Sequence, residues 1–393
     1  MAVPVEPAPR TPSRGITRRF DTGRKTMAAT NFAGLNSKQK IVWSRDVWSE
    51  ARDKMFVKRF VGKSENSMIQ LITDLTKTEK GERVLLQLVA DLVEDGVIGD
   101  NEREGNEEAM QNYEQEITID LISHQVRNKG KLADQKTVIR FREQARNKLA
   151  YWLANRIDQL VFLMLSGVSF AYKNNGAPRP STSPFPNLSF AADVHAPTAK
   201  RHLRWDAVNG LVAGDTTAVD PADVIGYRTI VDAMAYAKDH YMPPLMADGK
   251  EYYVGLVRPG TLAQLKKDPE FQRAVIGAMP RSKENPWFTG ATVTVDGLVL
   301  HEHRLVYSTL GAASGQKWGG GGTVNGSRTL ICGAQAMGMA DLGPPDWEEK
   351  WFDYRSKQGI SVDKMFGILK PQFFSIYDNS VEDFATLCID HAL

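Results

Sequence analysis

Cysteine is scarce in this chain, with two residues among 393. Cys332 and Cys388 are too few for the disulfide framework of a small secreted module, and this usage is typical of a reducing compartment. We expect two buried thiols that behave as small apolar side chains, with a bond between the two as the alternative. A fold that depends on several disulfides is therefore excluded.

Long apolar runs are also lacking. The opening residues, MAVPVEPAPRTPSRG, contain no such run, so we expect no secretory signal. The most apolar later stretch, 149–167, is interrupted by Arg156 and Asp158, two charges that a membrane span would accommodate only at high cost. We therefore predict no membrane partner and a protein that is cytosolic when it is made.

The chain has almost no net charge, formally +2, whereas a dedicated DNA-binding protein usually carries a clear basic excess. The charges are nevertheless divided into blocks. Residues 1–63 hold fourteen Lys and Arg against five Asp and Glu, and residues 94–120, called the acidic segment below, hold ten acidic residues and one basic residue. Blocks of opposite sign predict complementary contacts, either within a subunit or between subunits.

Eight charged residues are our candidates for contacts between subunits. They are Glu102, Glu104, Glu107 and Glu108 in the acidic segment, and Arg18, Arg19, Arg24 and Lys25 near the N-terminus. The hypothesis is that the acidic segment lies over a basic surface of a neighbouring copy, a surface that could include residues from 1–63. The alternative is a nucleic-acid-binding protein that uses the basic residues of 1–63 and of 201–205.

Complete catalytic and cofactor-binding motifs are missing from the sequence. There is no GxSxG motif, and the glycines of 319–322 lack the Lys and the following helix of a phosphate loop. His301-Glu302-His303 would place two imidazoles on one face of a strand, but a zinc protease needs two His one helical turn apart. We interpret this pair as structural, with a metal-dependent enzyme as the weaker alternative, and predict no catalytic residues, no metal ligands and no cofactor.

The first half of the sequence predicts arms around one long helix. Residues 1–30 are rich in Pro and Arg and cannot form a core of their own, whereas apolar residues of 38–60 recur at helical spacing. Apolar stretches near both ends of 64–130 predict a long β-hairpin. The strongest pattern lies in 134–167, where an apolar stripe predicts a helix about 50 Å long that ends at Gly167.

The second half mixes helices and strands without a regular βαβ period. Residues 174–220 are rich in Pro and turn-forming residues, so we expect a long loop or an insertion there. Asp220 should cap a helix whose first turn contains Pro221. Asp296-Gly297 should form the turn of a β-hairpin. Such a mixture predicts the α+β class.

Several segments of the C-terminal third resemble one known family. They are Asn285-Pro-Trp-Phe-Thr-Gly-Ala291, Asp296-Gly297, His301-Glu-His-Arg-Leu-Val306, Cys332-Gly-Ala-Gln-Ala336, Trp347-Glu-Glu, Phe352-Asp-Tyr354, Gly359-Ile-Ser and Gly367-Ile-Leu-Lys-Pro. Together they are similar to the major capsid proteins of podophages related to the coliphage N-four. Each segment alone is a weak match, and their combination and order make the resemblance specific.

The resemblance implies the fold shared by tailed-phage and herpesvirus capsid shells. In that fold an N-terminal arm precedes an extended β-hairpin loop, a long spine helix crosses a peripheral domain, and an axial domain completes the subunit. The corresponding parts of this chain would be 1–63 for the arm, 64–130 for the extended loop, 131–173 and 346–393 for the peripheral domain, 134–167 for the spine helix and 221–345 for the axial domain. Residues 174–220 depart from the family pattern as an insertion.

The resemblance also implies a function and partners. The protein would be a major capsid protein, not an enzyme, that self-assembles into hexamers and pentamers of an icosahedral shell around phage double-stranded DNA. Expected partners are further copies of the chain, a portal protein, scaffolding and decoration proteins, and the packaged DNA through non-specific contact. We expect assembly in the host bacterial cytoplasm and a final location in the virion capsid.

Overall fold

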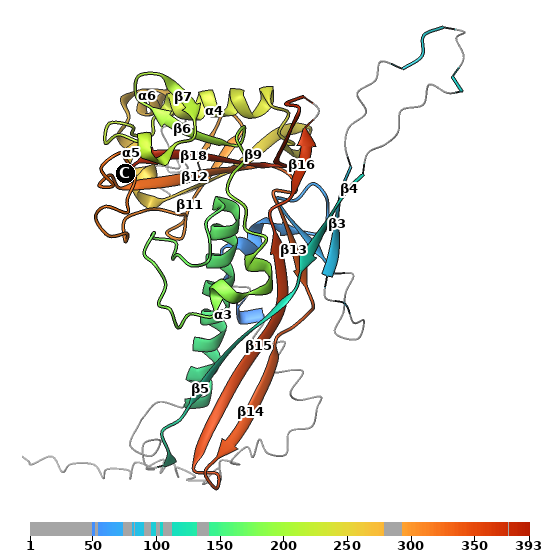
Figure 1. The fold of residues 1–393 in the computed structure, drawn as a ribbon, viewed down its shortest axis with the longest axis vertical. Helices are drawn as coiled ribbons and strands as arrows, with labels where there is room; N and C mark the ends of the chain where they lie inside the picture. Colours follow the sequence, from blue (N-terminus) through green and yellow to red (C-terminus); the bar gives the residue numbers. More distant parts are fainter. Residues whose placement is uncertain are drawn as a thin grey trace, which may run out of the picture.

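The computed structural model describes residues 49–51, 54–73, 81, 83–89, 96–99, 103–104, 112–131, 141–278, 293–375 and 377–393. These residues form two β-sheets, one long helix and two further hairpins (Figure 1). The long helix lies beside one sheet, and one of its ends reaches the other sheet. The mixture of helices and strands confirms the predicted α+β class.

Helix α3 (Phe141–Ser166) is the longest helix in the described part of the chain, and its 26 residues span about 39 Å. Its end at Gly167 is as predicted. Gly167 has a φ of +63°, and the N–H groups of Gly167 and Val168 donate to the carbonyls of Met164 and Leu163, both over 3.0 Å. This paired arrangement satisfies the last carbonyls of the helix. The predicted residues before Phe141 lie outside the described part.

The first sheet has six strands in the order β1-β2-β13-β15-β14, with β5 paired to the edge of β15 opposite β14. The bounds are β1 Val61–Gly62, β2 Ile69–Ile72, β5 Asp120–Arg127, β13 Met337–Asp341, β14 Asp346–Phe352 and β15 Lys357–Leu369. Strands β14 and β15 form a long hairpin that extends to one end of the molecule (Figure 1). Helix α3 runs beside this hairpin and contacts β15 and β5.

The second sheet has eight strands in the order β10-β11-β9-β12-β18-β6-β7, with β8 paired to β9. The bounds are β6 His202–Asp206, β7 Gly210–Ala213, β8 Leu245–Ala247, β9 Lys250–Val257, β10 Val293–Val295, β11 Leu298–Glu302, β12 Gly326–Cys332 and β18 Thr386–Ala392. Every residue of β12 and β18 is buried, which is expected of central strands covered on both faces. The predicted turn joins β10 to β11, with positive φ at Asp296 and Gly297, which a tight hairpin of this kind requires.

Two hairpins lie outside these sheets. Strand β3 (Arg83–Val89) pairs antiparallel with β4 (Asn112–Thr118), which confirms the predicted hairpin in its described part. Strand β16 (Gln372–Ser375) pairs with β17 (Ser380–Asp383). Other helices in the described part of the chain are α4 Tyr227–Asp239, α5 Pro259–Lys267 and α6 Pro269–Ala278. Short 3-10 turns there are η2 Val57–Phe60, η3 Phe185–Asn187, η4 Ser189–Ala191 and η5 Thr216–Ala218.

Two large apolar cores hold most of the subunit together. The larger core joins α3 to the first sheet and to one face of the second sheet, through residues such as Leu160, Phe366 and Leu330. The other core lies on the opposite face of the second sheet, beneath α4, α5 and α6. The second sheet is therefore covered on both faces, and α3 shares a core with both sheets.

The structure corrects two predictions for the middle of the chain. Residues 174–220 are not a loop throughout, because β6 and β7 lie within them and extend the second sheet. Asp220 does not cap a helix. It lies in a turn in which its backbone N–H donates to the Asp223 carboxylate over 2.8 Å, and α4 begins at Tyr227.

The division of the C-terminal part also differs from the expected one. The resemblance places 346–393, which include β18, in one domain with the long helix, but β18 pairs with β12 and β6 in the second sheet. Strand β13, expected within 221–345, pairs with β2 and β15 in the first sheet. Both strands form long-range pairs that local sequence patterns do not encode, so the chain crosses between the sheets more often than expected.

Candidate subunit-contact surfaces

One of the eight candidate residues lies in the described part of the chain. Glu104 is exposed to solvent. The others lie outside the described residues, namely Arg18, Arg19, Arg24, Lys25, Glu102, Glu107 and Glu108. The acidic candidates belong to the connection between β3 and β4, so the hairpin sets where this connection leaves the subunit.

The β3–β4 hairpin has one face on the core and one face in solvent. Val84, Leu86 and Ile117 are buried in a small core together with residues of the first sheet. The alternate positions are exposed, so Leu85 faces solvent and Arg83 forms an exposed ion pair with Glu116 across the hairpin. This alternation follows from the two-residue period of a strand. The outer face of the hairpin is therefore available to another molecule.

Close packing and hydrogen bonds fix the base of this hairpin. At Gly367 in β15, a Cβ would collide with the carbonyl oxygen of Thr118, so glycine allows β4 to cross the sheet there. The side-chain amide of Gln115 donates to the carbonyl of Gln372 over 2.7 Å and accepts from its N–H over 3.0 Å. The hairpin therefore leaves the subunit from a rigid base.

The β14–β15 hairpin carries a second exposed group at its tip. Asp353, Tyr354 and Arg355 have φ values of +53°, +48° and +63°, a left-handed conformation that side chains other than glycine adopt at a cost. Tyr354 is fully exposed and Trp351 is partly exposed. Three strained residues in a row that present an aromatic ring to solvent suggest a contact site, and sequence analysis did not single out this tip.

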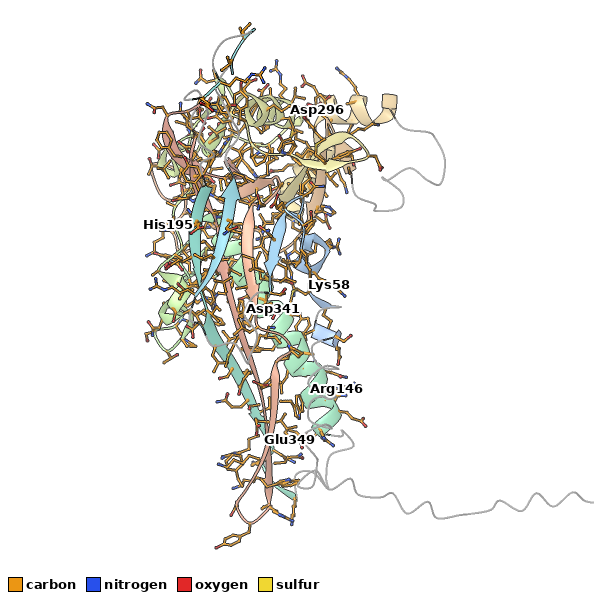
Figure 2. The ribbon with its side chains drawn as sticks, turned by 90° about the vertical axis from the view of Figure 1, so that its right-hand side faces the viewer. Lys58, Arg146, His195, Asp296, Asp341 and Glu349 are labelled. Atoms are coloured by element: carbon orange, nitrogen blue, oxygen red, sulfur yellow. The ribbon has the colours of Figure 1, made fainter. Side chains whose placement is uncertain are left out.

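Glu349 fastens the β14–β15 hairpin to α3. Its carboxylate accepts from Arg142 Nε over 3.0 Å, from Trp347 Nε1 over 2.9 Å and from Gln358 Nε2 over 3.2 Å. In Figure 2, Glu349 lies towards the narrow end of the molecule, below Asp341, with α3 and Arg146 beside it. Because α3 supports the hairpin along this length, the tip is held away from the second sheet.

The two imidazoles of His301-Glu302-His303 face an aromatic cluster. His303 stacks on Phe56 with 4.3 Å between ring centroids and on Phe162 with 5.1 Å, and Phe60 lies 5.0 Å from His301. Burial lowers the pKa of His303 to about 4, and nearby Arg304 and Arg59 add to the effect. Both rings share one face, as predicted, and both pack against aromatic side chains.

Metal-binding geometry is missing around these imidazoles in the described part of the chain. No group of three or more His, Cys, Asp or Glu there could hold a metal ion. Helices that could cross a membrane are also not found among the described residues. Both cysteines are free and buried, and burial raises the pKa of the Cys388 thiol to about 12, so it stays protonated and unreactive.

The basic and aromatic residues of 201–205, considered above for nucleic-acid binding, point into the protein. Arg201 is fully buried, Trp205 is buried, and Arg204 forms ion pairs with Asp206 over 3.2 Å and Asp223 over 3.5 Å. These side chains therefore form no basic surface for phosphates.

A buried ion network closes the second sheet at its centre. Arg328 of β12 binds the Asp390 carboxylate of β18 through Nε over 2.6 Å and through Nη2 over 2.8 Å, and His202 of β6 lies 2.7 Å from the same carboxylate. Arg328 also donates to the carbonyl of Ser166, at the end of α3, over 2.7 Å. Burial alone would raise the pKa of Asp390, but Arg328 and His202 outweigh it and hold this pKa at about 2.

Comparisons with known proteins agree with this architecture. The family model described as "Phage capsid protein" matches residues 31–393. The major capsid protein of Pseudomonas phage KPP25 is 50% identical over 362 residues, which cover 91% of this chain and 96% of that protein. The capsid of Ralstonia phage GP4 is 26% identical with a TM-score of 0.70, and the match covers 86% of this chain and 90% of that one.

A more distant capsid has the same fold. The Cyanophage Pam1 capsid is 19% identical with a TM-score of 0.66 over 86% of this chain and 91% of that one. The extended hairpin, the long helix and the paired sheets thus occur in a chain whose sequence profile and relatives are those of virion structural proteins, not of enzymes. This chain therefore belongs to the phage capsid protein family.

Proposed function

We propose that this protein self-assembles into hexamers and pentamers, which close an icosahedral shell around phage double-stranded DNA. The observation that carries this proposal is the pair of hairpins, β3–β4 and β14–β15, that extend beyond the two large apolar cores of the subunit. Extended, half-exposed hairpins gain stability when a neighbouring copy covers them, and repeated contacts between identical copies build closed assemblies.

Electron microscopy of the purified full-length protein tests this proposal. We expect capsomers or closed shells, because the contact surfaces are part of the chain itself. A protein that remains a small monomer under conditions that permit assembly would contradict it.

Each part of the subunit has a different role in this proposal. Residues 1–63 and the β3–β4 hairpin would link neighbouring copies. The second sheet with α4, α5 and α6 would form the axial domain that gathers at fivefold and sixfold axes, and α3 with the first sheet would form the peripheral domain. The strained tip at Tyr354 would contact another copy at the outer end of the peripheral domain.

Charge would set the register of the contacts. We propose that Glu102, Glu104, Glu107 and Glu108 lie over a basic surface of a neighbour, with Arg18, Arg19, Arg24 and Lys25 as candidate partners. Single exposed pairs contribute only about 0–1 kcal/mol, so the affinity would come mainly from apolar burial repeated over many contacts.

Replacing these four glutamates together with glutamine tests the charge hypothesis. We expect weaker assembly and a smaller dependence of assembly on salt concentration, because fewer opposite charges meet. The matched control neutralises four exposed acidic residues of the second sheet and its helices, namely Asp248, Glu251, Glu270 and Glu302. Unchanged assembly and salt dependence in the glutamate variant would contradict the hypothesis.

Further partners follow from assembly around DNA. A portal protein, scaffolding proteins and decoration proteins are proposed partners, and assembly is proposed to occur in the host bacterial cytoplasm. The formal net charge of +2 supports only non-specific contact with the packaged DNA.

A further inference from the structure

A cavity of about 790 Å³ opens beside α3, between β5 and the loop 173–185. It is called the basic pocket here, and its volume lies within the range of about 300–1,000 Å³ that is usual for small-molecule sites. The permanently charged side chains that line it are Arg156, Lys173, Arg179 and Arg304, and none of the described residues in its lining is Asp or Glu. A concave site with several cations and no acidic residue attracts negative charge.

Neutral groups hold the guanidinium groups of the basic pocket in place. Gln159 Oε1 accepts from Arg156 Nη1 over 2.8 Å and from Arg179 Nη2 over 3.5 Å. The hydroxyl of Tyr151 accepts from Arg304 Nη2 over 3.0 Å. Burial and the charge of Arg156 lower the pKa of Arg179 to about 10, as expected when cations are gathered without an anion. These bonds orient the cations without neutralising them, and each guanidinium keeps further N–H groups for a ligand.

The placement of the cations indicates a compact anion with several charges. They come from separate segments, namely α3 with Arg156, the loop 173–185 with Lys173 and Arg179, and the segment after β11 with Arg304. Cations that surround a cavity suit a small ligand, whereas a nucleic-acid backbone is usually followed by cations along an open groove. Guanidinium groups match phosphate oxygens in geometry, and a nucleoside triphosphate carries roughly four negative charges at neutral pH.

A buried acceptor in the same pocket requires a hydrogen-bond donor from the ligand. Asn174 is 5% exposed, and its Nδ2 donates to the carbonyls of Gln159 over 3.2 Å and Leu305 over 2.8 Å. Its Oδ1 has no hydrogen-bond partner among the described residues. A buried acceptor of this kind is normally satisfied, so a ligand that completes the pocket should bring an O–H or N–H group as well as phosphate.

An aromatic wall in the pocket suits a planar ring. His124 of β5 stacks on Trp152 of α3 with 4.5 Å between ring centroids and 20° between the ring planes. His124 is exposed, so the face of its ring that is turned away from Trp152 is accessible to a ligand. Proteins commonly hold a nucleobase by stacking it on an aromatic side chain. The pocket therefore offers separate places for phosphates, for a donor group and for a base.

We propose that the basic pocket binds a free nucleoside triphosphate. The phosphates contact Arg156, Arg179 and Arg304, the base stacks on His124, and a ribose hydroxyl or a base amino group donates to Asn174 Oδ1. Bound in this way, the ligand connects α3, β5 and the segment after β11 within one subunit. The site is complete in a single chain, so the proposal goes beyond the assembly function and does not depend on it.

Titration calorimetry with ATP tests the proposal on unassembled full-length protein, with a chelator present so that the triphosphate keeps its charge. We expect one ATP per chain. The variant Arg156→Gln/Arg179→Gln/Arg304→Gln should bind ATP at least about tenfold more weakly, because it loses three charge-assisted contacts. The matched control, Arg228→Gln/Lys238→Gln/Lys250→Gln, neutralises exposed cations elsewhere and should change binding less than about twofold. No binding of ATP at millimolar concentration would overturn the proposal.

Inorganic triphosphate and duplex DNA separate a nucleotide site from a general phosphate site. Inorganic triphosphate lacks the base and the ribose, so it should bind at least about fivefold more weakly than ATP. His124→Ala should weaken ATP and leave inorganic triphosphate unchanged. Equal binding of ATP and inorganic triphosphate to the unchanged protein would contradict the proposal. So would a short DNA duplex that binds as tightly as ATP and is weakened equally by the triple substitution.

Photochemical labelling with 8-azido-ATP locates the site in the unchanged protein, so the result does not depend on whether the triple variant folds. The azide is activated by light and attaches to groups close to the base. Mass spectrometry should find the label on peptides that contain His124, Trp152 or residues of 173–185, and excess ATP should suppress it. Labelling that ATP suppresses only at other peptides would place the nucleotide elsewhere and overturn the proposal.

Discussion

The second sheet and the extended hairpins contain the same kinds of charged side chain in opposite surroundings. In the second sheet, Arg328 and Asp390 are buried and bonded to each other. In the β3–β4 hairpin, Arg83 and Glu116 form an ion pair that remains exposed to solvent. A buried charge is costly unless it is paired, whereas an exposed pair contributes little and remains available to other partners. The charges of the second sheet are therefore satisfied within the subunit, whereas those of the β3–β4 hairpin remain accessible to another molecule.

The largest expected effect comes from disrupting the buried pair of Arg328 and Asp390. Asp390→Asn would leave the Arg328 guanidinium buried without its counter-charge, which costs about 3–5 kcal/mol of the free energy of unfolding. Urea unfolding of the unassembled subunit measures this quantity. Arg83→Gln is the matched control in the hairpin and should change it by less than about 1 kcal/mol. If the two variants lost equal amounts of the free energy of unfolding, burial would not explain a difference between the second sheet and the hairpin.

A glycine substitution tests how rigidly the hairpin is mounted. Gly367→Ala would place a methyl group against the carbonyl of Thr118, and relieving such a clash costs about 1–3 kcal/mol. We expect faster amide hydrogen exchange in β4 (Asn112–Thr118), with little change in β12. Gly320→Ala is the control, because its Cβ would meet no atom closer than 3.8 Å. Unchanged exchange in β4 would mean that the close approach at Gly367 does not hold the hairpin.

Acid should loosen the junction between β11 and α3. The pKa of His303 is about 4 in the folded protein, against an ordinary value of 6.5, because the charged form is disfavoured among Phe56 and Phe162. The unfolded chain therefore binds the extra proton first, and the stability due to His303 falls as the pH drops from 6.5 to 4. Allowing for solvent screening of this partly exposed ring, the change is about 1–2 kcal/mol.

Asp158 acts in the opposite direction at the same junction. Its carboxylate accepts from the N–H groups of Phe56 and Val57, but burial dominates and raises its pKa to about 6. Its contribution therefore falls as the pH rises from 4 to 6. The variant His303→Phe retains the aromatic stack but removes the titrating ring. On acidification from pH 6.5 to 4, its free energy of unfolding, measured with urea, should fall less than that of the unchanged protein, or rise. Parallel pH profiles for the two proteins would contradict this assignment.

The smallest expected effect on the isolated subunit concerns the β14–β15 tip. Tyr354→Ser removes a ring that touches solvent only, so the free energy of unfolding should change by less than about 0.5 kcal/mol. Assembly should nevertheless decrease, as measured by the fraction of protein that sediments as particles. Val208→Ser, which changes another highly exposed residue between β6 and β7, should leave that fraction unchanged. If the sedimenting fraction fell by a similar amount in both variants, the tip would not be a more important contact site than the exposed surface of the second sheet.

Local features were predictable from the sequence because their signals lie close together in the chain. The apolar stripe of α3, its end at Gly167 and the Asp296-Gly297 turn each depend on a few neighbouring residues. Strand β6 was missed although His202–Asp206 alternates between polar and apolar residues, because the Pro-rich residues before it favoured a loop. That alternation was the signal that could have found it.

Long-range arrangements were not predictable from one sequence. No local pattern states that β18 pairs with β6, or that His124, Arg156, Arg179 and Arg304 from four separate segments surround one pocket. The strain at Tyr354 depends on a turn conformation that residues 353–355 do not ordinarily favour. The charge blocks were visible in the sequence, but their partners depend on tertiary and quaternary contacts.

The place of β18 also has a consequence for the order of events during synthesis. His202 and Asp390 are 188 residues apart in the sequence, and β18 lies between β12 and β6. At about 5–20 residues per second, a ribosome takes roughly 10–40 s to travel between them. During that time β6 and β7 have no strand to join them to β12, so a nascent chain cannot close the sheet. In the proposed assembly, a truncated chain without β18 would therefore lack the finished second sheet that a growing particle requires.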